Sequence, residues 1–201
     1  MSVPRTPMLA VTGRPPDNPA WAIELQWEGA RVLAACDGTT CHLQGGDGSD
    51  LTGSYPEVAA AVAAAAHGRV LTLDGVITEI ATCAEPFAPP HDSPELPPAV
   101  RLCAFDLLSA EEQDLTSWPY LARRHHLEGL GLEHALVSVA PSWRGVEAEA
   151  MLAAAAQQHV RGIVSKEIES TYHPGRCSLS WIATSIRNHF APTQAPVAAR
   201  V

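Results

Sequence analysis

Lysine is almost absent from this chain of 201 residues. Its 13 basic residues comprise twelve arginines and a single lysine, Lys166, so any mechanism that needs a lysine nucleophile has one candidate. Positive charge is scarce overall, because 22 acidic residues leave a net charge of -9. Binding to a nucleic-acid backbone is driven largely by Lys and Arg side chains that displace condensed counterions. This charge balance therefore works against an extended nucleic-acid surface.

Long apolar runs are also missing. No stretch approaches the roughly 20 residues that span a bilayer, and the N-terminal residues contain no continuous apolar segment followed by a cleavage site. We therefore expect a cytoplasmic protein that does not enter a membrane. With 46% hydrophobic residues and no long polar tract, the chain is expected to form one domain over residues 1–190, followed by a disordered tail at 191–201.

Paired cysteines and clustered metal ligands are absent from the sequence pattern as well. The five cysteines are scattered and lack C-x-x-C spacing, which argues against a disulfide framework and against a structural zinc site. We expect reduced thiols. His125 and His126 are adjacent, and neighbours on a helix point about 100° apart, so they cannot chelate one ion together. No metal site is expected.

The apolar pattern and the turn residues predict alternating strands and helices. Strands are expected at 21–26, 31–37, 40–44, 69–80, 100–108, 136–140, 162–166 and 180–186, the first three as an antiparallel meander. Helices are expected at 55–66 with Ser54 as N-cap, at 118–130 after Thr116 or Ser117, and at 146–158. Six prolines predict an exposed loop at 83–98. This mixture favours the α+β class.

Several short motifs follow one another along the chain. They are PMLA from Pro7, PPDNPAW ending at Trp21, ELQWEGAR over 24–31, DGSDLT ending at Thr52, LDGVI from Leu73, AFDLL from Ala104, DLTSWPYLARR from Asp114, RGIVSK ending at Lys166 and SxYxPGxxSxxW ending at Trp181. In this order and at this spacing they resemble the adenylation domain of ATP-dependent DNA ligases, especially the bacterial ligases of double-strand break repair. The resemblance implies that family's nucleotidyltransferase fold, with antiparallel sheets flanked by helices.

The resemblance also implies a reaction. In this family a lysine attacks the α-phosphate of ATP and forms a covalent lysyl-AMP, while Mg²⁺ and two further lysines neutralise the phosphates. An aromatic ring stacks on adenine, and a separate OB-fold domain closes over the site. The AMP then passes to the 5′-phosphate of a nick.

Five positions of this chain depart from the family pattern. Gln26 stands at the position of the nucleophilic lysine, and a carboxamide nitrogen is neither basic nor nucleophilic. Val76 and Arg161 stand where the family has carboxylates that serve ribose and metal. Ala183 and Ser185 replace the two phosphate-neutralising lysines. The resemblance thus implies that nucleophile, metal site and phosphate clamp are missing, so we expect no catalytic residue and no cofactor.

Four residues remain as candidates for residual nucleotide contacts. Glu24 is the first residue of the ELQWEGAR motif, which contains position 26. Arg31 is its last residue and stands where the family has an arginine that faces the nucleotide. Phe105 matches the adenine-stacking aromatic residue, and Lys166 matches the last residue of its motif. Three of them have a structural alternative: an ion pair for Arg31, an apolar core position for Phe105 and a solvated strand end for Lys166.

Three functional hypotheses follow from these residues. The first is a pseudoenzyme that binds an unidentified protein partner, or a nucleotide weakly, in a DNA-repair setting. The second is a nucleotidyltransferase with residual activity, which would need a nucleophile other than position 26. The third is a non-catalytic nucleic-acid-binding module, for which the sequence offers the arginines Arg123, Arg124, Arg161 and Arg187.

Overall fold

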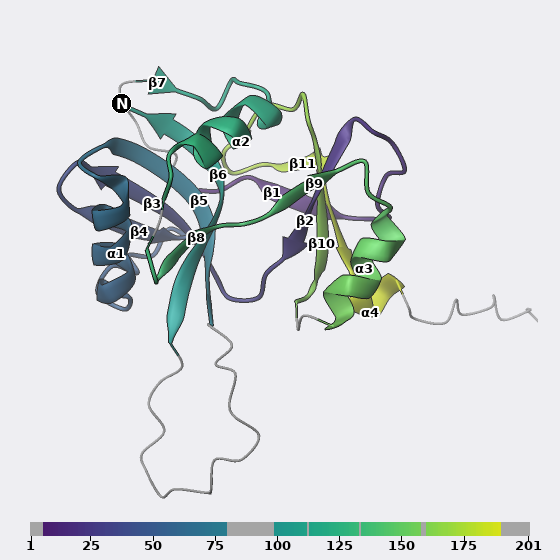
Figure 1. Cartoon of the computed structure of the whole chain (residues 1–201), viewed down its shortest axis with the longest axis horizontal. Helices are drawn as coiled ribbons and strands as arrows, with labels where there is room; N and C mark the ends of the chain where they lie inside the picture. The colour runs from purple at the N-terminus through teal and green to yellow at the C-terminus, as the bar shows by residue number, and fades with distance from the viewer. Residues whose placement is uncertain (1–5, 80–98, 112, 133, 158–159, 190–201) are drawn as a thin grey trace, which may run out of the picture.

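Two β-sheets that pack against each other form the centre of the molecule (Figure 1). The computed structural model describes residues 6–79, 99–111, 113–132, 134–157 and 160–189. The expected loop at 83–98 and the expected tail at 191–201 lie outside these residues, and the expectation of one domain over 1–190 stays a prediction. No helix of the described residues is long and apolar enough to cross a bilayer.

The smaller sheet has five strands in the order β1-β11-β10-β2-β9. These are Leu9–Thr12, Cys177–Ser185, Gly162–Glu167, Trp21–Gln26 and Ser142–Arg144. The larger sheet has the order β4-β3-β5-β6-β7, with β8 paired to β6. Its strands are Cys41–Gly45, Ala30–Asp37, Val70–Glu79, Val100–Ala110, Gln113–Asp114 and Val137–Val139. All pairings are antiparallel except β1 with β11 and β8 with β6.

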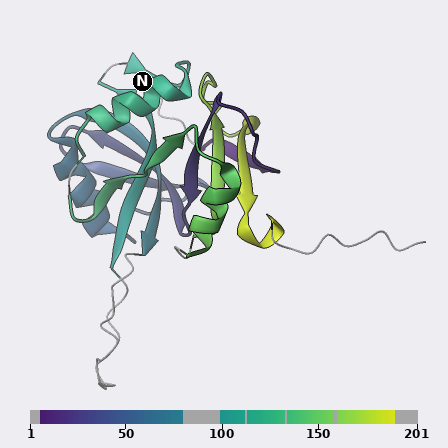
Figure 2. The same ribbon diagram turned by 45° about the vertical axis from the view of Figure 1, so that its right-hand side comes forward.

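Helices cover the sheets from outside (Figure 2). The helices are α1 (Pro56–Ala66), α2 (Tyr120–Gly129), α3 (Ala148–Gln157) and α4 (Ile186–His189) in the described part of the chain. Helix α1 packs against β3 and β4, α2 against β6, and α3 against β10. Small side chains let α1 approach its sheet closely, because its buried face consists of valines and alanines. The observed mixture of antiparallel sheets and helices confirms the α+β class.

A separate apolar cluster lies where the two sheets meet. Leu33, Val76 and Phe105 enter it from the larger sheet, and Trp181 enters it from the smaller one. Because this cluster is distinct from the core under α1 and from the core under α3, the facing surfaces of the two sheets form a region of their own. Two of the residues singled out by the sequence, Val76 and Phe105, belong to this cluster.

Three details of the local predictions were wrong. Strand β2 does not form a meander with β3: β2 pairs with β10 and β9, whereas β3 pairs with β4 and β5. Ser54 does not cap α1, since the N-cap is Tyr55 without a side-chain hydrogen bond. Helix α2 starts at Tyr120 after Pro119, and the Thr116 hydroxyl instead donates to Asp114 Oδ1 at 2.7 Å.

The expectation that all cysteines are reduced was also wrong. Cys36 and Cys41 form a disulfide. They are directly opposite each other in the antiparallel pair of β3 and β4, with their Cα atoms 4.1 Å apart, so the strand register alone brings the two sulfur atoms together. Cys103 and Cys177 are free thiols, the first buried and the second exposed.

Candidate functional site

The smaller sheet places the substituted positions in one cross-strand row. Gly162 of β10 pairs with Gln26 of β2 on one side and with Ser185 of β11 on the other. Directly opposite residues of antiparallel strands point to the same face, so Gln26 and Ser185 share a face. The next row on that face contains Glu24 and Ala183, which pair with the two sides of Val164. The three positions that the resemblance assigns to substituted lysines, Gln26, Ala183 and Ser185, therefore lie on one face of the sheet.

Lys166 occupies the third row of the same face and is buried. It pairs with Ala22 and Trp181, and its relative exposure is 1%. The alternative of a solvated strand end is therefore wrong. Its Nζ atom lies 2.7 Å from Glu24 Oε2. Burial lowers the pKa of Lys166, although the neighbouring carboxylate of Glu24 opposes this shift.

Three aromatic rings surround the ammonium group of Lys166. The Nζ atom lies 4.3 Å from the centroid of Phe105, 4.3 Å from that of Trp181 and 5.0 Å from that of Tyr120. Each ring face is attracted to a cation. Tyr120 also donates a hydrogen bond to Glu24 Oε1, and burial next to this carboxylate raises the pKa of the phenol. Lys166 thus occupies a closed pocket built by its own chain.

Phe105 is covered by cations rather than open to a ligand. Its relative exposure is 7%, and the Arg31 guanidinium lies 4.5 Å from its ring centroid, in addition to the Lys166 ammonium group. Trp181 packs against it edge-on, with ring centroids 6.3 Å apart. Stacking of adenine on Phe105 would therefore need one of these side chains to move, and this role of Phe105 stays a prediction.

Arg31 forms a bidentate ion pair with Asp74 of β5. Its Nε lies 2.6 Å from Oδ1 and its Nη2 lies 2.7 Å from Oδ2, while Nη2 also donates to the Met8 carbonyl at 3.2 Å. The carboxylate accepts a further bond from the Tyr172 hydroxyl at 2.7 Å. Arg31 therefore makes the structural ion pair that the sequence left open as its alternative role.

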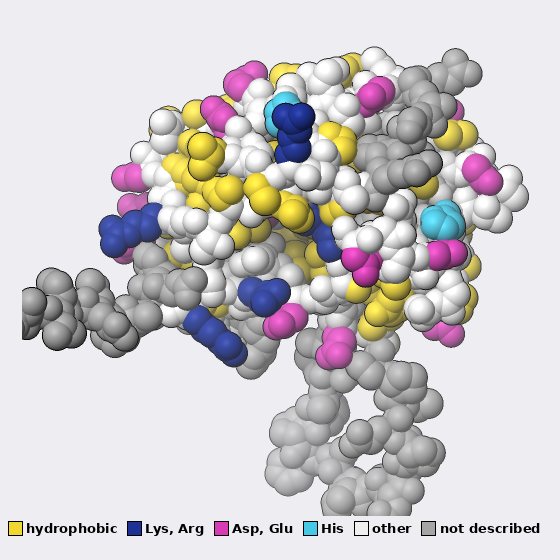
Figure 3. All heavy atoms as spheres, turned by 180° about the vertical axis from the view of Figure 1, so that it is seen from behind, with side chains coloured by type: hydrophobic (Ala, Val, Ile, Leu, Met, Phe, Trp, Pro, Cys, Tyr) yellow, Lys and Arg dark blue, Asp and Glu magenta, His cyan; other side chains and the backbone are white. Residues whose placement is uncertain are grey.

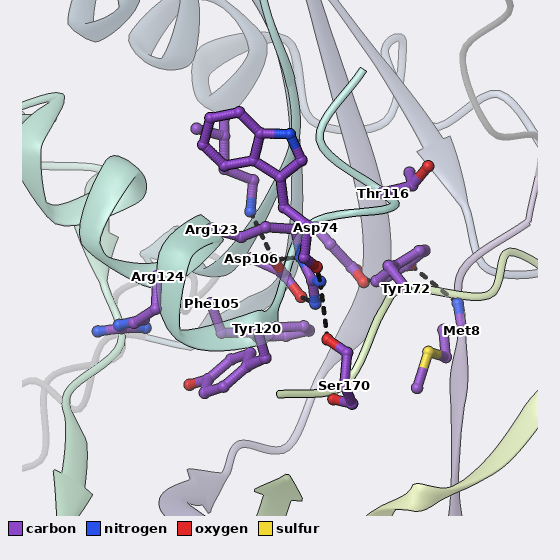
Figure 4. Close-up of polar contacts among 12 residues, drawn as sticks. Met8, Asp74, Phe105, Asp106, Thr116, Tyr120, Arg123, Arg124, Ser170 and Tyr172 are labelled. Atoms are coloured by element: carbon purple, nitrogen blue, oxygen red, sulfur yellow. Dashed lines mark hydrogen bonds and ion pairs between the residues drawn. The ribbon is translucent and has the colours of Figure 1, made fainter. Parts of the chain in front are cut away.

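A second bidentate pair joins α2 to β6. Arg123 Nε and Nη2 lie 2.8 and 2.9 Å from the two oxygens of Asp106, and both side chains have no exposed surface. Figure 4 shows the two side chains pointing toward each other, with Ser170 beside the guanidinium. Arg124, one residue further along α2, lies 3.5 Å from Glu24 Oε1 and 2.8 Å from Glu128.

These pairings take two of the four arginines considered for nucleic-acid binding away from the surface. Arg123 and Arg124 are 0% and 3% exposed, so neither is available at the surface. Arg161 is exposed and lies 3.8 Å from the Glu28 carboxylate, near Arg187 at the start of α4. On the face shown in Figure 3 several basic side chains lie near one another toward the lower left, with an acidic side chain beside them. Of the four arginines considered, Arg161 and Arg187 are exposed at the surface.

The two residues that the resemblance assigns to the family's carboxylate positions do not fit Mg²⁺–ATP. Val76 is buried in the apolar cluster between the sheets, and Arg161 is a cation, whereas Mg²⁺ requires oxygen ligands. The described residues contain no group of three His, Cys, Asp or Glu side chains placed to hold a metal ion. Gln26 Oε1 is buried without a hydrogen-bond partner.

Several site residues were missed by sequence reasoning. Asp74 and Tyr172 bond to each other beside Arg31, and Tyr120 bonds to Glu24 beside Lys166, yet none of the three was a candidate. Tyr120 and Arg124 are four residues apart on α2, so they lie on one helix face. This spacing indicates a shared face, but not that Glu24, which is distant in the chain, lies opposite it.

Comparisons with known proteins agree with the resemblance that the motifs carry. The family described as ATP dependent DNA ligase domain matches residues 7–183. The multifunctional non-homologous end joining protein LigD of Mycolicibacterium smegmatis is 33% identical over 189 residues, covering 90% of this chain and 24% of the relative. The corresponding DNA repair protein LigD of Mycobacterium tuberculosis is 29% identical over 178 residues, with 88% and 23% covered. The chain thus spans about a quarter of the length of these relatives.

Solved structures show the same likeness. The ligase domain of M. tuberculosis LigD superposes with a TM-score of 0.74 at 29% identity, and mycobacterial DNA ligase D complexed with ATP and MES superposes with 0.73 at 27%. Each comparison covers 90% of this chain and 60% of the other. Chlorella virus DNA ligase-adenylate, at 13% identity and a TM-score of 0.63, shares the fold alone. These structures confirm the nucleotidyltransferase fold.

Proposed function

Because the chain belongs to the family of ATP-dependent DNA ligase domains, we propose that it is a member that does not adenylate itself. It serves as a non-catalytic binding module in DNA repair. One observation carries this proposal: Gln26, Ala183 and Ser185 line one face of the smaller sheet, where the family has three lysines. An amide, a methyl group and a hydroxyl supply neither a nucleophilic amine nor a positive charge for the phosphates.

The only lysine does not replace the missing nucleophile. Lys166 is 1% exposed, and its ammonium group is in contact with the Glu24 carboxylate. Nucleophilic attack requires a free amine that reaches the α-phosphate. An ammonium group enclosed by aromatic rings and a carboxylate meets neither condition, so the lowered pKa of Lys166 does not make it a nucleophile.

Charge pairing supports weak nucleotide binding at most. Arg31 is paired with Asp74, Lys166 with Glu24, and Arg123 with Asp106. A triphosphate brings several negative charges, and each cation recruited to it would have to leave a buried carboxylate unpaired, which is costly. We therefore expect ATP and AMP to bind weakly and without dependence on Mg²⁺.

The remaining role is binding of a protein partner. The relatives named LigD are described as multifunctional proteins of non-homologous end joining, which supports a DNA-repair setting for this chain. The net charge of -9 disfavours a nucleic acid as the main partner. Capture of interacting proteins from the native cell, followed by reconstitution with the purified partner, identifies the assembly.

Adenylation is tested with α-radiolabelled ATP and Mg²⁺ on a denaturing gel. The wild-type chain is expected to remain unlabelled, and the Q26K variant is also expected to remain unlabelled because the phosphate-neutralising positions are still Ala183 and Ser185. A labelled wild-type band would refute the proposal, and its loss in K166R would assign the label to Lys166. Labelling of Q26K alone would refute the stated loss of the phosphate clamp. An active member of the family serves as positive control.

A further inference from the structure

The Cys36–Cys41 disulfide lies apart from the candidate nucleotide region. Both cysteines belong to the apolar core under α1, whereas Val76 and Phe105 belong to the cluster between the two sheets. Cys36 and Cys41 are directly opposite each other in an antiparallel pair, so both side chains point to one face of the larger sheet. That face is the one that α1 covers (Figure 1). The disulfide is thus also separate from the five substituted positions.

A cavity of about 500 Å³ opens between α1 and the end of the β3–β4 hairpin, on the face to which the disulfide points. Cys41 is among the described residues of its wall, and Cys36 is not. The other described wall residues are small and uncharged: Thr39, Thr40, Thr52, Pro56 and four alanines of α1. Both cysteines are 5% exposed, which shields the disulfide from large reagents. A small molecule in the cavity therefore meets Cys41 and not Cys36.

The hairpin turn holds the two cysteines together without help from the disulfide. The Asp37 N–H donates to the Thr40 carbonyl at 3.0 Å. The Asp37 Oδ1 atom accepts from the backbone N–H groups of Thr39 and Thr40 at 2.8 and 2.7 Å. These bonds close the turn directly beside the cysteine pair. After cleavage of the S–S bond the two thiols therefore stay opposite each other, and the bond re-forms within the hairpin.

We propose that the disulfide is a reversible modification site for low-molecular-weight thiols and that Cys41 receives the thiol. A thiolate attacks Cys41 Sγ, a new S–S bond joins the thiol to Cys41, and the bond to Cys36 breaks. Cys36 leaves with the bonding electron pair and takes a proton from water. Attack by Cys36 on the adduct restores the disulfide and releases the thiol. Attack by a second thiol instead leaves both cysteines reduced and releases the oxidised thiol dimer.

The choice of Cys41 is tested by comparing C36A/C177S with C41A/C177S. Each variant keeps one cysteine of the hairpin and lacks the exposed thiol of Cys177, while buried Cys103 is common to both. Oxidised glutathione is added at about pH 8, intact-mass spectrometry follows the adduct, and peptide mapping locates it. We expect the adduct on Cys41 to form about tenfold faster than the adduct on Cys36, because exchange depends on access to the sulfur.

A63L tests whether the thiol enters through the cavity. Ala63 is a wall residue, so a leucine there narrows the space beside Cys41. In the C36A/C177S background we expect A63L to slow formation of the adduct about fivefold. A153L is the matched control, because Ala153 is exposed on α3 and is not among the described wall residues. It should react like its parent, and circular dichroism confirms that each variant is folded.

Reversibility is tested in C177S, which keeps both hairpin cysteines. Excess reduced glutathione should open the disulfide of the folded protein, and exchange into oxidised glutathione should restore it. The proposal is overturned if reduced glutathione leaves the disulfide intact in the folded protein but cleaves it in the denatured chain. It is also overturned if Cys36 is modified as fast as Cys41, or if A63L reacts like A153L.

Discussion

The buried pair of Asp106 and Arg123 offers the sharpest test of why parts of the ligase pattern persist. Both residues belong to motifs shared with the family, and both side chains are fully buried. The guanidinium also donates to the carbonyls of Trp118 and Ser170, at 2.5 and 3.2 Å. If these motifs persist for structural reasons, breaking the pair should damage the fold directly.

Removal of one partner from such a pair costs about 3–5 kcal/mol, because the other partner stays buried without compensation. R123M should therefore lower the free energy of unfolding by this amount, and so should D106L. The double variant D106L/R123M leaves no unpaired charge, so we expect it to be less destabilised than the sum of the singles by about 2 kcal/mol or more.

Urea denaturation followed by circular dichroism measures these free energies, with the slope of the transition as a check that unfolding stays two-state. R161M is the control, because Arg161 is 61% exposed and lies 3.8 Å from Glu28. We expect its unfolding free energy to equal that of the wild type within error. Single variants that cost less than about 1 kcal/mol, or costs that add fully in the double variant, would refute the assigned structural role.

Three further predictions concern the cysteines. The pKa of Cys103 is raised by burial from its ordinary value of 9.0 to about 11, so the unfolded state loses this proton first as pH rises. The stabilisation that comes from burying the neutral Cys103 thiol should be complete below pH 9.0 and lost toward pH 11. The C103A variant should therefore show a weaker dependence of the unfolding free energy on pH over this range. At pH 8, peptide mapping should show alkylation of exposed Cys177 long before that of Cys103. The Cys36–Cys41 disulfide closes a short loop, so C36A/C41A should cost about 2 kcal/mol in urea, and an unchanged midpoint would contradict this.

Local sequence signals identified most strands and helices but failed where the chain changes sheets. Trp27 to Ala30 reads as a hairpin turn between two strands, and a hairpin would pair β2 with β3. In the structure the segment carries the chain from the smaller sheet to the larger one. Gly29 has a φ of +142°, and a Cβ atom there would lie 2.0 Å from the Ile77 carbonyl oxygen. Turn residues allow both connections, and only the packing of the two sheets selects one.

In the candidate site, too, the sequence predicted some features and missed others. The resemblance identified Gln26, Ala183 and Ser185 as substituted positions, and the register of β2, β10 and β11 places them on one face. The burial of Lys166 against Glu24 was not foreseen, since a lysine at a strand end usually reaches solvent. The disulfide was missed although the expected neighbouring strands at 31–37 and 40–44 do pair, because the cysteines were judged by C-x-x-C spacing and not by the register of that strand pair.

The sequence alone determines that lysine is scarce in this protein. A side chain that lacks an amine cannot gain one by folding, so position 26 offers no nucleophilic nitrogen in any conformation. Only the tertiary structure decided what the remaining groups do. It brought Lys166 to Glu24, and Arg123 to Asp106, from segments distant in the chain. Those pairings depend on how two sheets and a helix pack, and no local pattern encodes such distances.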